Sequence, residues 1–363
     1  MKTHNFLKLT VCLAMAACAP TTQTPNISNE MAAKEAAIQR ELVIKEKNEL
    51  DTRLQNTAAK ILMANPELCG DLITTYTGIK YTTIDAVQKD YRDVMRGIYG
   101  VGEYPTVTMV TQKTPASGVL KLGDVITHVN GEALPKNKKG MNTISSAIEK
   151  NINAEPMIFT VERAGSIKDV TLNPVHICKS PVYLAMNDAV NAYADGKSIV
   201  ITKGMMRFVE NDTELATVIG HELAHNTREH MDSKRGNAMI GAVLGVALSV
   251  AIGVDVTDIG TSLGASANSQ AFEAEADYVG LYHTARAGFK IDNAPNLWRR
   301  MAASNPEAIH VAGTSHPSTA KRFLALEATV KEINKKKSQG KKLVPEEKEK
   351  QDFQNKEKGA LNE

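Results

Sequence analysis

The sequence predicts an α+β protein with two domains, and three observations support this prediction. The chain has 363 residues, and the part that follows its apolar leader is too long for one ordinary hydrophobic core. Apolar residues recur at helical spacing near the N-terminus and again beyond residue 210. Between these regions, two β-rich runs joined by a glycine-containing turn predict a hairpin. The predicted fold therefore combines mostly helical regions with a β-rich segment, as α+β proteins do.

The charges of the chain nearly balance. The formal net charge is +2, from 43 lysines and arginines and 41 aspartates and glutamates that are mixed along the sequence. Nucleic acid is therefore not an expected partner.

Residues 1–17 are expected to be a targeting segment that forms no part of the fold. The run Met15-Ala16-Ala17-Cys18 resembles a bacterial lipobox. That resemblance implies a lipid on Cys18, and the alanine that follows implies an outer-membrane anchor. Residues 18–29 are polar and predict a flexible tether. The alternative is cleavage after Ala17 or Ala19, which would give a soluble periplasmic protein.

Residues 30–95 are predicted to be an N-terminal helical segment. Apolar residues recur there at helical spacing, which indicates one or two amphipathic helices that pack on the C-terminal domain. The apolar positions are Met31, Ile38, Leu42, Leu50, Leu54, Ala58 and Ile61.

Residues 96–176 resemble a PDZ domain. The segment from Leu122 to Gly131 matches the Gly-Asp strand and turn of that family, and residues 157–172 contain the predicted hairpin. The resemblance implies that the domain binds the C-terminal peptide of a substrate or partner by strand addition. The loop Tyr99-Gly100-Val101-Gly102 would bind the peptide carboxylate. The alternative is a structural insert whose groove is occluded.

The run His221-Glu222-Leu223-Ala224-His225 is the H-E-x-x-H pattern with which a helix holds a zinc ion and a general base. Residues four apart share one helix face, so His221 and His225 can bind the same ion. Glu222, one step round the helix, can deprotonate a water molecule at the metal. The run Asn211-Asp212-Thr213-Glu214 is predicted to cap this helix. The alternative is a surface helix with two solvated histidines.

A third metal ligand is predicted in the helix-forming stretch 269–277. Glu273 would complete a two-histidine, one-glutamate zinc site, and Asp277 would orient a ligand histidine. Glu275 is expected to point away into solvent. His230 is expected to lie on the surface and not to bind the ion. The alternative for Glu273 and Asp277 is an exposed, charged helix face.

The segment from about Cys178 to Arg322 resembles metallopeptidase family forty-eight. The resemblance implies a mostly helical, gluzincin-type zinc endopeptidase domain over residues 177–330, with one Zn²⁺ per chain and a small sheet that has an exposed edge. Such a domain acts on polypeptides in an extended conformation. The matching motifs follow the family's order: Asn191-Ala192-Tyr193-Ala194, Ser198–Thr202, Gly204-Met205-Met206, Glu214-Leu215-Ala216, the H-E-x-x-H helix, Glu273 with Asp277, and His316-Pro317 with Arg322.

The strand Ser198-Ile199-Val200-Ile201-Thr202 is predicted to be the exposed edge to which a substrate adds by main-chain hydrogen bonds. The alternative is an ordinary member of the sheet.

His316 lies in a turn-rich loop and has three interpretations. It could donate a hydrogen bond to the oxyanion of the reaction, occupy the open position of the zinc ion and hold the enzyme inactive, or cap the next helix.

Cys69 and Cys178 lie on either side of the PDZ-like segment. In an oxidising compartment they are predicted to form a disulfide. Closing a loop of about 109 residues would stabilise the fold by roughly 4–5 kcal/mol on the chain-entropy model. Two buried free thiols are the alternative.

Two further segments have unusual composition. Residues 238–254 carry no charge and are at the lower limit for spanning a bilayer, but a buried or lid-forming helical hairpin is favoured over a membrane span. Residues 331–363 are rich in lysine and glutamate and are predicted to be a disordered tail.

These features together predict a zinc-dependent endopeptidase of the bacterial cell envelope that cleaves misfolded or unassembled proteins. A periplasmic chaperone or assembly factor with little proteolysis and a peptide-binding scaffold are the alternatives. The presence of Glu222 disfavours both, because neither needs a base beside a metal.

Overall fold

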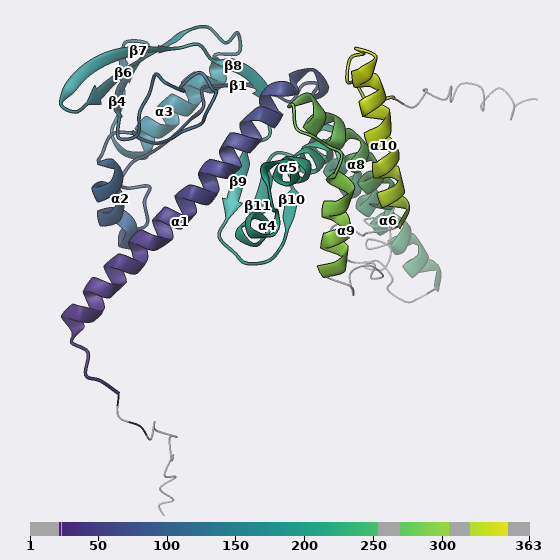
Figure 1. Cartoon of the computed structure of the whole chain (residues 1–363), viewed down its shortest axis with the longest axis horizontal. Coiled ribbons are helices and arrows are strands. Elements are labelled where there is room, and N and C mark those ends of the chain that lie inside the picture. Colours follow the sequence, from purple (N-terminus) through teal and green to yellow (C-terminus); the bar gives the residue numbers. More distant parts are fainter. Residues whose placement is uncertain (1–21, 23, 253–268, 305–319, 348–363) are drawn as a thin grey trace, which may run out of the picture.

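The computed structural model describes residue 22 and residues 24–252, 269–304 and 320–347. A long helix, α1 (Asn29–Ala64), runs diagonally between a β-rich domain and a mostly helical domain (Figure 1). The α+β fold class is therefore confirmed. Cys18 and His316 lie outside the described residues, and so do residues 1–17.

The β-rich domain contains a six-stranded antiparallel sheet with two helices, α2 (Arg92–Tyr99) and α3 (Asn137–Lys150). The strand order is β2-β3-β4-β6-β7, and the short β5 pairs with β4. One face of the sheet is buried: side chains of β6 alternate between the core and the surface, with Met157, Phe159 and Val161 inside. The strands are β2 (Ile79–Thr82), β3 (Thr106–Val110), β4 (Val125–Val129), β5 (Glu132–Ala133), β6 (Met157–Arg163) and β7 (Ser166–Leu172).

The predicted hairpin is present as β6 and β7. Its turn is Ala164-Gly165, and both residues have positive φ (50° and 75°), which is the conformation that a two-residue hairpin turn of type I′ requires. The predicted domain boundary at residue 96 is wrong, however. The strand β2 lies in the segment that was predicted to be helical, but it pairs with β3 and extends this sheet.

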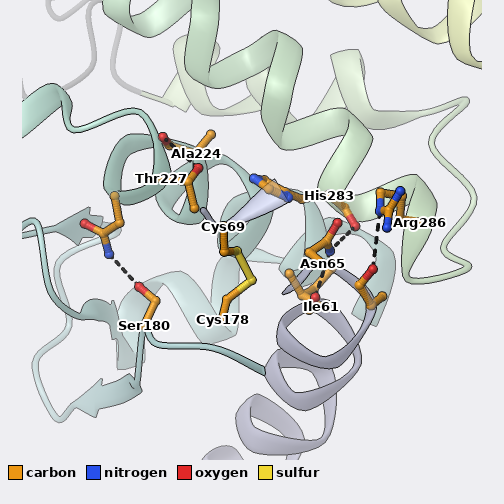
Figure 2. Close-up of a disulfide and its surroundings, with 11 residues drawn as sticks. Ile61, Asn65, Cys69, Cys178, Ser180, Ala224, Thr227, His283 and Arg286 are labelled. Carbon is orange, nitrogen blue, oxygen red and sulfur yellow. Dashed lines mark hydrogen bonds between the residues drawn. A yellow bond between two sulfur atoms is a disulfide. The ribbon is translucent and has the colours of Figure 1, made fainter. Parts of the chain in front are cut away.

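The connection between the two domains is a two-stranded ladder, β1 (Ile73–Tyr76) and β8 (Val175–Cys178). A short 3-10 helix, Pro66–Leu68, precedes it, and a second one, Lys89–Tyr91, precedes α2. The structure contains the predicted disulfide between Cys69 and Cys178, whose Cα atoms are 5.7 Å apart (Figure 2). The chain thus leaves for the β-rich domain and returns from it at one covalently closed point.

The second domain combines a three-stranded sheet with helices. The sheet order is β10-β11-β9, in which β11 is antiparallel to β10 and parallel to β9. The buried core of this domain includes Ile199 and Ile201 of β11, Leu215 and Ile219 of the following helix, and Leu54 of α1. The elements are β9 (Val182–Ala185), β10 (Ala192–Ala194), β11 (Ile199–Thr202), α4 (Lys203–Phe208), α5 (Asp212–Thr227), α6 (His230–Ile252), α8 (Ser269–Arg286), α9 (Ala294–Ser304) and α10 (Ala320–Ser338).

The predicted packing of the N-terminal helix holds for its second half only. Leu54, Ala58 and Ile61 of α1 are buried against the helical domain. Met31 and Leu42, from the same apolar pattern, are exposed because the N-terminal turns of α1 extend beyond both domains (Figure 1). A helical period therefore predicted the helix correctly but not the length of its contact.

The predicted disordered tail begins too early in the sequence. Helix α10 continues to Ser338, and Ile333 on its inner face is fully buried. The segment after the helix returns to the domain, where the backbone N–H of Glu346 donates to the Tyr278 hydroxyl at 2.9 Å. Residues 331–347 therefore belong to the fold, and residues 348–363 lie outside the described part.

Helix α6 contains residues 238–252 of the uncharged segment, for which a buried or lid-forming helical hairpin was predicted and a membrane span was the alternative. Among the described side chains of this segment, Met239, Ile240 and Val243 are exposed. The prediction of burial is therefore wrong for these residues. Within the described residues, no helix combines the length and the apolar character that crossing a bilayer needs.

His283 of α8 is fully buried beside Asn65, whose side chain donates to the His283 carbonyl oxygen (Figure 2). Burial, followed by the positive charges of Arg228 and Arg286, lowers the pKa of His283 to about 3. The unfolded chain takes up this proton near pH 6.5, whereas the folded protein does not. The stabilising contribution of neutral His283 is therefore complete above about pH 6.5 and is lost as the pH falls toward 3.

We expect this residue to make the protein sensitive to mild acid. Between pH 7 and pH 5 the free energy of unfolding should fall by about 2 kcal/mol more in the wild type than in His283→Leu. Urea titrations of both proteins at the two pH values measure the difference. Equal pH dependence in the two proteins would contradict a neutral buried His283.

Candidate metal centre

The helix that carries the H-E-x-x-H run, α5, begins as the sequence predicted. The Asn211 side chain accepts hydrogen bonds from the N–H groups of Thr213 and Glu214 at 3.0 and 3.1 Å. Glu214 reaches back to the N–H of Glu210 at 2.8 Å and also binds Arg300. These bonds satisfy the free N–H groups of the first turn, so α5 has a fixed start.

Three predicted ligands lie together at the centre of the helical domain. The Nε2 atom of His221 is 3.2 Å from Nε2 of His225, and the two carboxylate oxygens of Glu273 lie 3.4 Å from one imidazole each. All three residues are at most 3% exposed. One donor atom from each residue therefore faces the same small space, and the donor atoms lie within 4.8 Å of one another.

Close packing of α5 on α8 makes this arrangement possible. A Cβ atom on Gly220 of α5 would lie 2.6 Å from the carbonyl oxygen of Gly280 of α8. A Cβ atom on Gly280 would lie 2.8 Å from the Cα atom of His221. Only glycine fits at either position, and the two helices can approach closely enough for a carboxylate of α8 to reach histidines of α5.

Asp277 lies where the sequence predicted, behind His221. Its carboxylate is 3.0 Å from the Nδ1 atom of His221 and accepts two hydrogen bonds from Arg322 of α10, at 2.7 and 2.9 Å. Arg322 also lies 3.5 Å from Glu273 and over the ring of Trp298. Asp277 thus fixes the ring orientation of His221, and Arg322 in turn fixes Asp277.

The surrounding carboxylates favour positive charge at this centre. Burial alone would lower the pKa of His221, but hydrogen bonds to Asp277 and Glu273 outweigh it and raise that pKa to about 10. Burial likewise would raise the pKa of Asp277, but His221 and Arg322 hold it below its ordinary value. A metal cation between the imidazoles would be stabilised by the same carboxylates that stabilise the proton on His221.

The residues fit a zinc ion. Two imidazole nitrogens and one carboxylate are the donor set that catalytic zinc sites use, and the buried carboxylates compensate for the ion's charge. Glu222, which is 1% exposed, follows His221 directly on α5. Burial lowers the pKa of Arg322, but Asp277 first, then Glu273 and Glu222, raise it above its usual value, so the Glu222 carboxylate belongs to the same charge cluster.

The expectation that His230 lies on the surface is wrong. It is 1% exposed, and its Nδ1 atom lies 2.9 Å from Nδ1 of the ligand His225. The expectation assumed that α5 continues past His225, but α5 ends at Thr227 and the chain turns at Glu229, which has a positive φ of 54°. Glu275, expected to be solvated, is half-exposed and contacts His230 at 3.1 Å.

The strand Ser198–Thr202 is not an edge strand. Its regular part, β11, is the central strand of the three-stranded sheet, with β10 on one side and β9 on the other. The alternative interpretation, an ordinary sheet member, is therefore correct, and an extended substrate cannot add to it. The edge strand beside α5 is β10: the N–H of Gly196, in the β10–β11 turn, donates to Asn226, the residue after His225, at 2.8 Å.

In the predicted peptide-binding loop, the N–H groups of Gly100 and Val101 already donate to the carbonyl oxygens of Arg96 and Met95, so neither is available to a peptide carboxylate in this structure. Tyr99 ends α2 and its hydroxyl accepts a hydrogen bond from Asn48 of α1, Gly100 is the left-handed cap of α2, and Val101 is buried. Gly102 accepts a backbone hydrogen bond from Ile84. None of these four residues lines the cavity described next.

A cavity of about 360 Å³ lies where the β-rich domain meets the helical domain. Ile79 of β2 and Ile148 of α3 line it from the β-rich domain, Ala58 of α1 and Val182 of β9 line it from the other side, and Thr77 lies between. The walls of the cavity therefore come from both domains.

The buried donor set on two helices of this α+β domain is that of a metallopeptidase. Residues 166–330, less than half of the chain, match the sequence model of peptidase family M48, and this match agrees with the resemblance that the motifs predicted.

Two curated relatives match this region. The beta-barrel assembly-enhancing protease of Yersinia pestis is 31% identical over 134 residues, which cover 33% of this chain and 28% of that protein. The mitochondrial metalloendopeptidase OMA1 of Arabidopsis thaliana is 32% identical over 136 residues, which cover 37% of this chain and 28% of that protein. The chain thus spans less than a third of the length of these relatives.

Two solved structures are similar to part of this chain, and one of them is a PDZ domain. The HtrA3 PDZ domain bound to a phage-derived ligand has 22% sequence identity and a TM-score of 0.21, over 29% of this chain and 88% of that one. The HtrA-type protease AlgW with a decapeptide has 21% identity and a TM-score of 0.22, over 29% of this chain and 30% of that one.

Proposed function

We propose that this protein is a zinc-dependent endopeptidase of the bacterial cell envelope that cleaves misfolded or unassembled proteins. The observation that carries the proposal is the buried cluster of His221, His225 and Glu273, with Glu222 beside it on α5. A zinc ion bound to these three side chains would acidify a water molecule and polarise the carbonyl group of the scissile peptide bond.

The chain's own residues supply the proton transfers. Glu222 accepts the proton of the attacking water on its carboxylate and returns it to the leaving nitrogen of the substrate. Asp277 accepts a hydrogen bond from Nδ1–H of His221, so that Nε2 of His221 keeps its lone pair for metal binding. Arg322 keeps the Asp277 carboxylate ionised.

The free edge of β10 is the candidate binding strand for a substrate. Among the described strands, β10 pairs with β11 on one side only, and its turn is bonded to α5 one residue after His225. Main-chain hydrogen bonds along this edge would align an extended segment beside the metal site with little dependence on sequence. Such binding suits an enzyme that acts on unfolded chains.

The β-rich domain is proposed to recruit substrates through their tails. The strand β2 ends the sheet and lines the cavity together with α3, so a peptide could add to β2 and place an apolar side chain in that cavity. A lipid on Cys18 would hold the enzyme on the periplasmic face of the outer membrane, where unassembled envelope proteins occur. The lipobox resemblance and the disulfide both support this compartment.

Cleavage of casein or of an unfolded outer-membrane protein tests the function. We expect Glu222→Gln to lower the turnover by about 10²–10⁴-fold, because the amide cannot take the proton from water, and a chelator to abolish it. Zinc content should stay at that of the wild type, since Glu222 is not a ligand. Equal cleavage by both proteins would contradict the proposal. No cleavage by either, with suppression of substrate aggregation, would favour the chaperone.

A further inference from the structure

His225 has a partner behind it that corresponds to Asp277 behind His221. The Nδ1 atom of His230 lies 2.9 Å from Nδ1 of His225, and the Nε2 atom of His230 lies 3.1 Å from a carboxylate oxygen of Glu275. His225, His230 and Glu275 therefore form a line that leads from the metal site to the surface, where Glu275 is half-exposed.

The position of His230 is fixed from several sides. It is the first residue of α6, its ring stacks on Phe272 of α8 with ring centres 4.8 Å apart, and it meets the ring of His225 edge to face. Glu229 turns the chain just before it, with a φ of 54°. A non-glycine residue in that conformation costs free energy, which the burial of His230 offsets.

The hydrogen-bond partners determine where the protons lie. A carboxylate only accepts, so Nε2 of His230 donates its hydrogen to Glu275. The Nδ1 atom of neutral His230 is then an acceptor, and Nδ1 of His225 must donate to it across 2.9 Å. This leaves the lone pair of His225 on Nε2, the atom that faces His221 and Glu273.

We propose that His230, oriented by Glu275, is a positioning residue that holds His225 in the tautomer and ring orientation required for metal binding. The proposal rests on the metal site of the proposed function but not on proteolysis. It gives each ligand histidine its own support, because Asp277 acts on His221 and His230 acts on His225.

Metal affinity tests the proposal with three variants. His230→Phe keeps an aromatic ring on Phe272 but removes the acceptor, and we expect the zinc dissociation constant to rise about 10–100-fold in a chelator competition assay. His230→Asn places an acceptor oxygen near the lost Nδ1 atom and should recover most of the affinity. Glu275→Ala should weaken binding because the tautomer of His230 is no longer fixed. His176→Asn, an exposed histidine of β8, is the matched control and should bind zinc as the wild type does.

A spectroscopic readout separates positioning from a purely structural role. With cobalt(II) in place of zinc, the visible absorption of His230→Phe should shift relative to the wild type, and that of His230→Asn should return toward it. Unchanged affinity and spectrum in His230→Phe would overturn the proposal, as would equal losses in the Phe and Asn variants with lowered melting temperatures. Absence of zinc binding by the wild type would overturn it too. Zinc binding that depends on His230 in a protein that cleaves nothing would refute only the proteolytic function.

Discussion

Glu273→Gln is expected to lose zinc and, with it, nearly all proteolytic activity. The substitution preserves the size of a side chain that is fully buried, but it removes the negative charge that faces both imidazoles. It also removes one of the two carboxylates that face the buried Arg322, so that Asp277 is left to balance both this guanidinium and the ion. We expect the zinc dissociation constant to rise by more than about 100-fold, beyond the usual effect of losing a group that only supports a ligand.

The zinc content of the purified variant, measured after equilibration against a buffered zinc solution, checks this expectation. Glu327→Gln on α10 is a suitable control, because Glu327 is partly exposed and pairs with Arg299 away from the metal centre. Full zinc occupancy in Glu273→Gln would mean that the third ligand is another residue, and the proposed centre would have to be abandoned.

Removal of the disulfide is expected to give the largest loss of stability. Cys69 and Cys178 are 109 residues apart in sequence, so the crosslink closes a long loop in the unfolded chain. The double variant Cys69→Ser, Cys178→Ser should have a free energy of unfolding lower by about 4–5 kcal/mol on the chain-entropy model. The β1–β8 ladder beside it remains, so the folded structure should change little.

Denaturant titrations of the double variant and of the wild type, with and without a reducing agent, measure this loss. Reduction should destabilise the wild type to a similar extent and leave the double variant unaffected. If the oxidised wild type and the double variant unfold at the same denaturant concentration, the crosslink does not restrict the unfolded chain as proposed.

The parts of the metal centre that depend on local sequence could be predicted. The cap of α5 and the shared face of His221 and His225 follow from helix geometry, which acts over four residues. Glu273 and Asp277 were predicted from their four-residue spacing on a helix-forming stretch and from the donor set of a catalytic zinc ion. A helical period alone does not say which acidic side chain faces a distant helix, so an exposed, charged helix face stayed open as the alternative. The structure brings both to His221.

The role of His230 could not be predicted from spacing, because the spacing assumed an unbroken helix. The break at Glu229 requires a positive φ, and no glycine or asparagine stands there to indicate it. The sequence does contain His230 and, two residues after the third ligand, Glu275. Nothing in the sequence pairs these two residues, and their contact is seen only once α6 and α8 are placed in space.

Strand order is also a property of the whole fold. The β-branched run 199–202 predicted a strand correctly, but Ile199 and Ile201 are both fully buried, and the same composition suits a central or an edge strand. The three-residue β10 has no such run, yet it forms the edge beside α5. Likewise, Ile333 lies among lysines and glutamates, so its burial in α10 was not visible in the composition of residues 331–363.

The dimensions of the metal centre are set by two residues that have no side chains. Gly220 and Gly280 lie back to back, and a single methyl group at either would act as a wedge between the helices that carry the donor atoms. Helix backbones are stiff, so the separation forced there would be transmitted directly to the distance between the histidines and Glu273. The affinity for the ion therefore depends on the backbone contact between Gly220 and Gly280 as well as on the side chains that bind the ion.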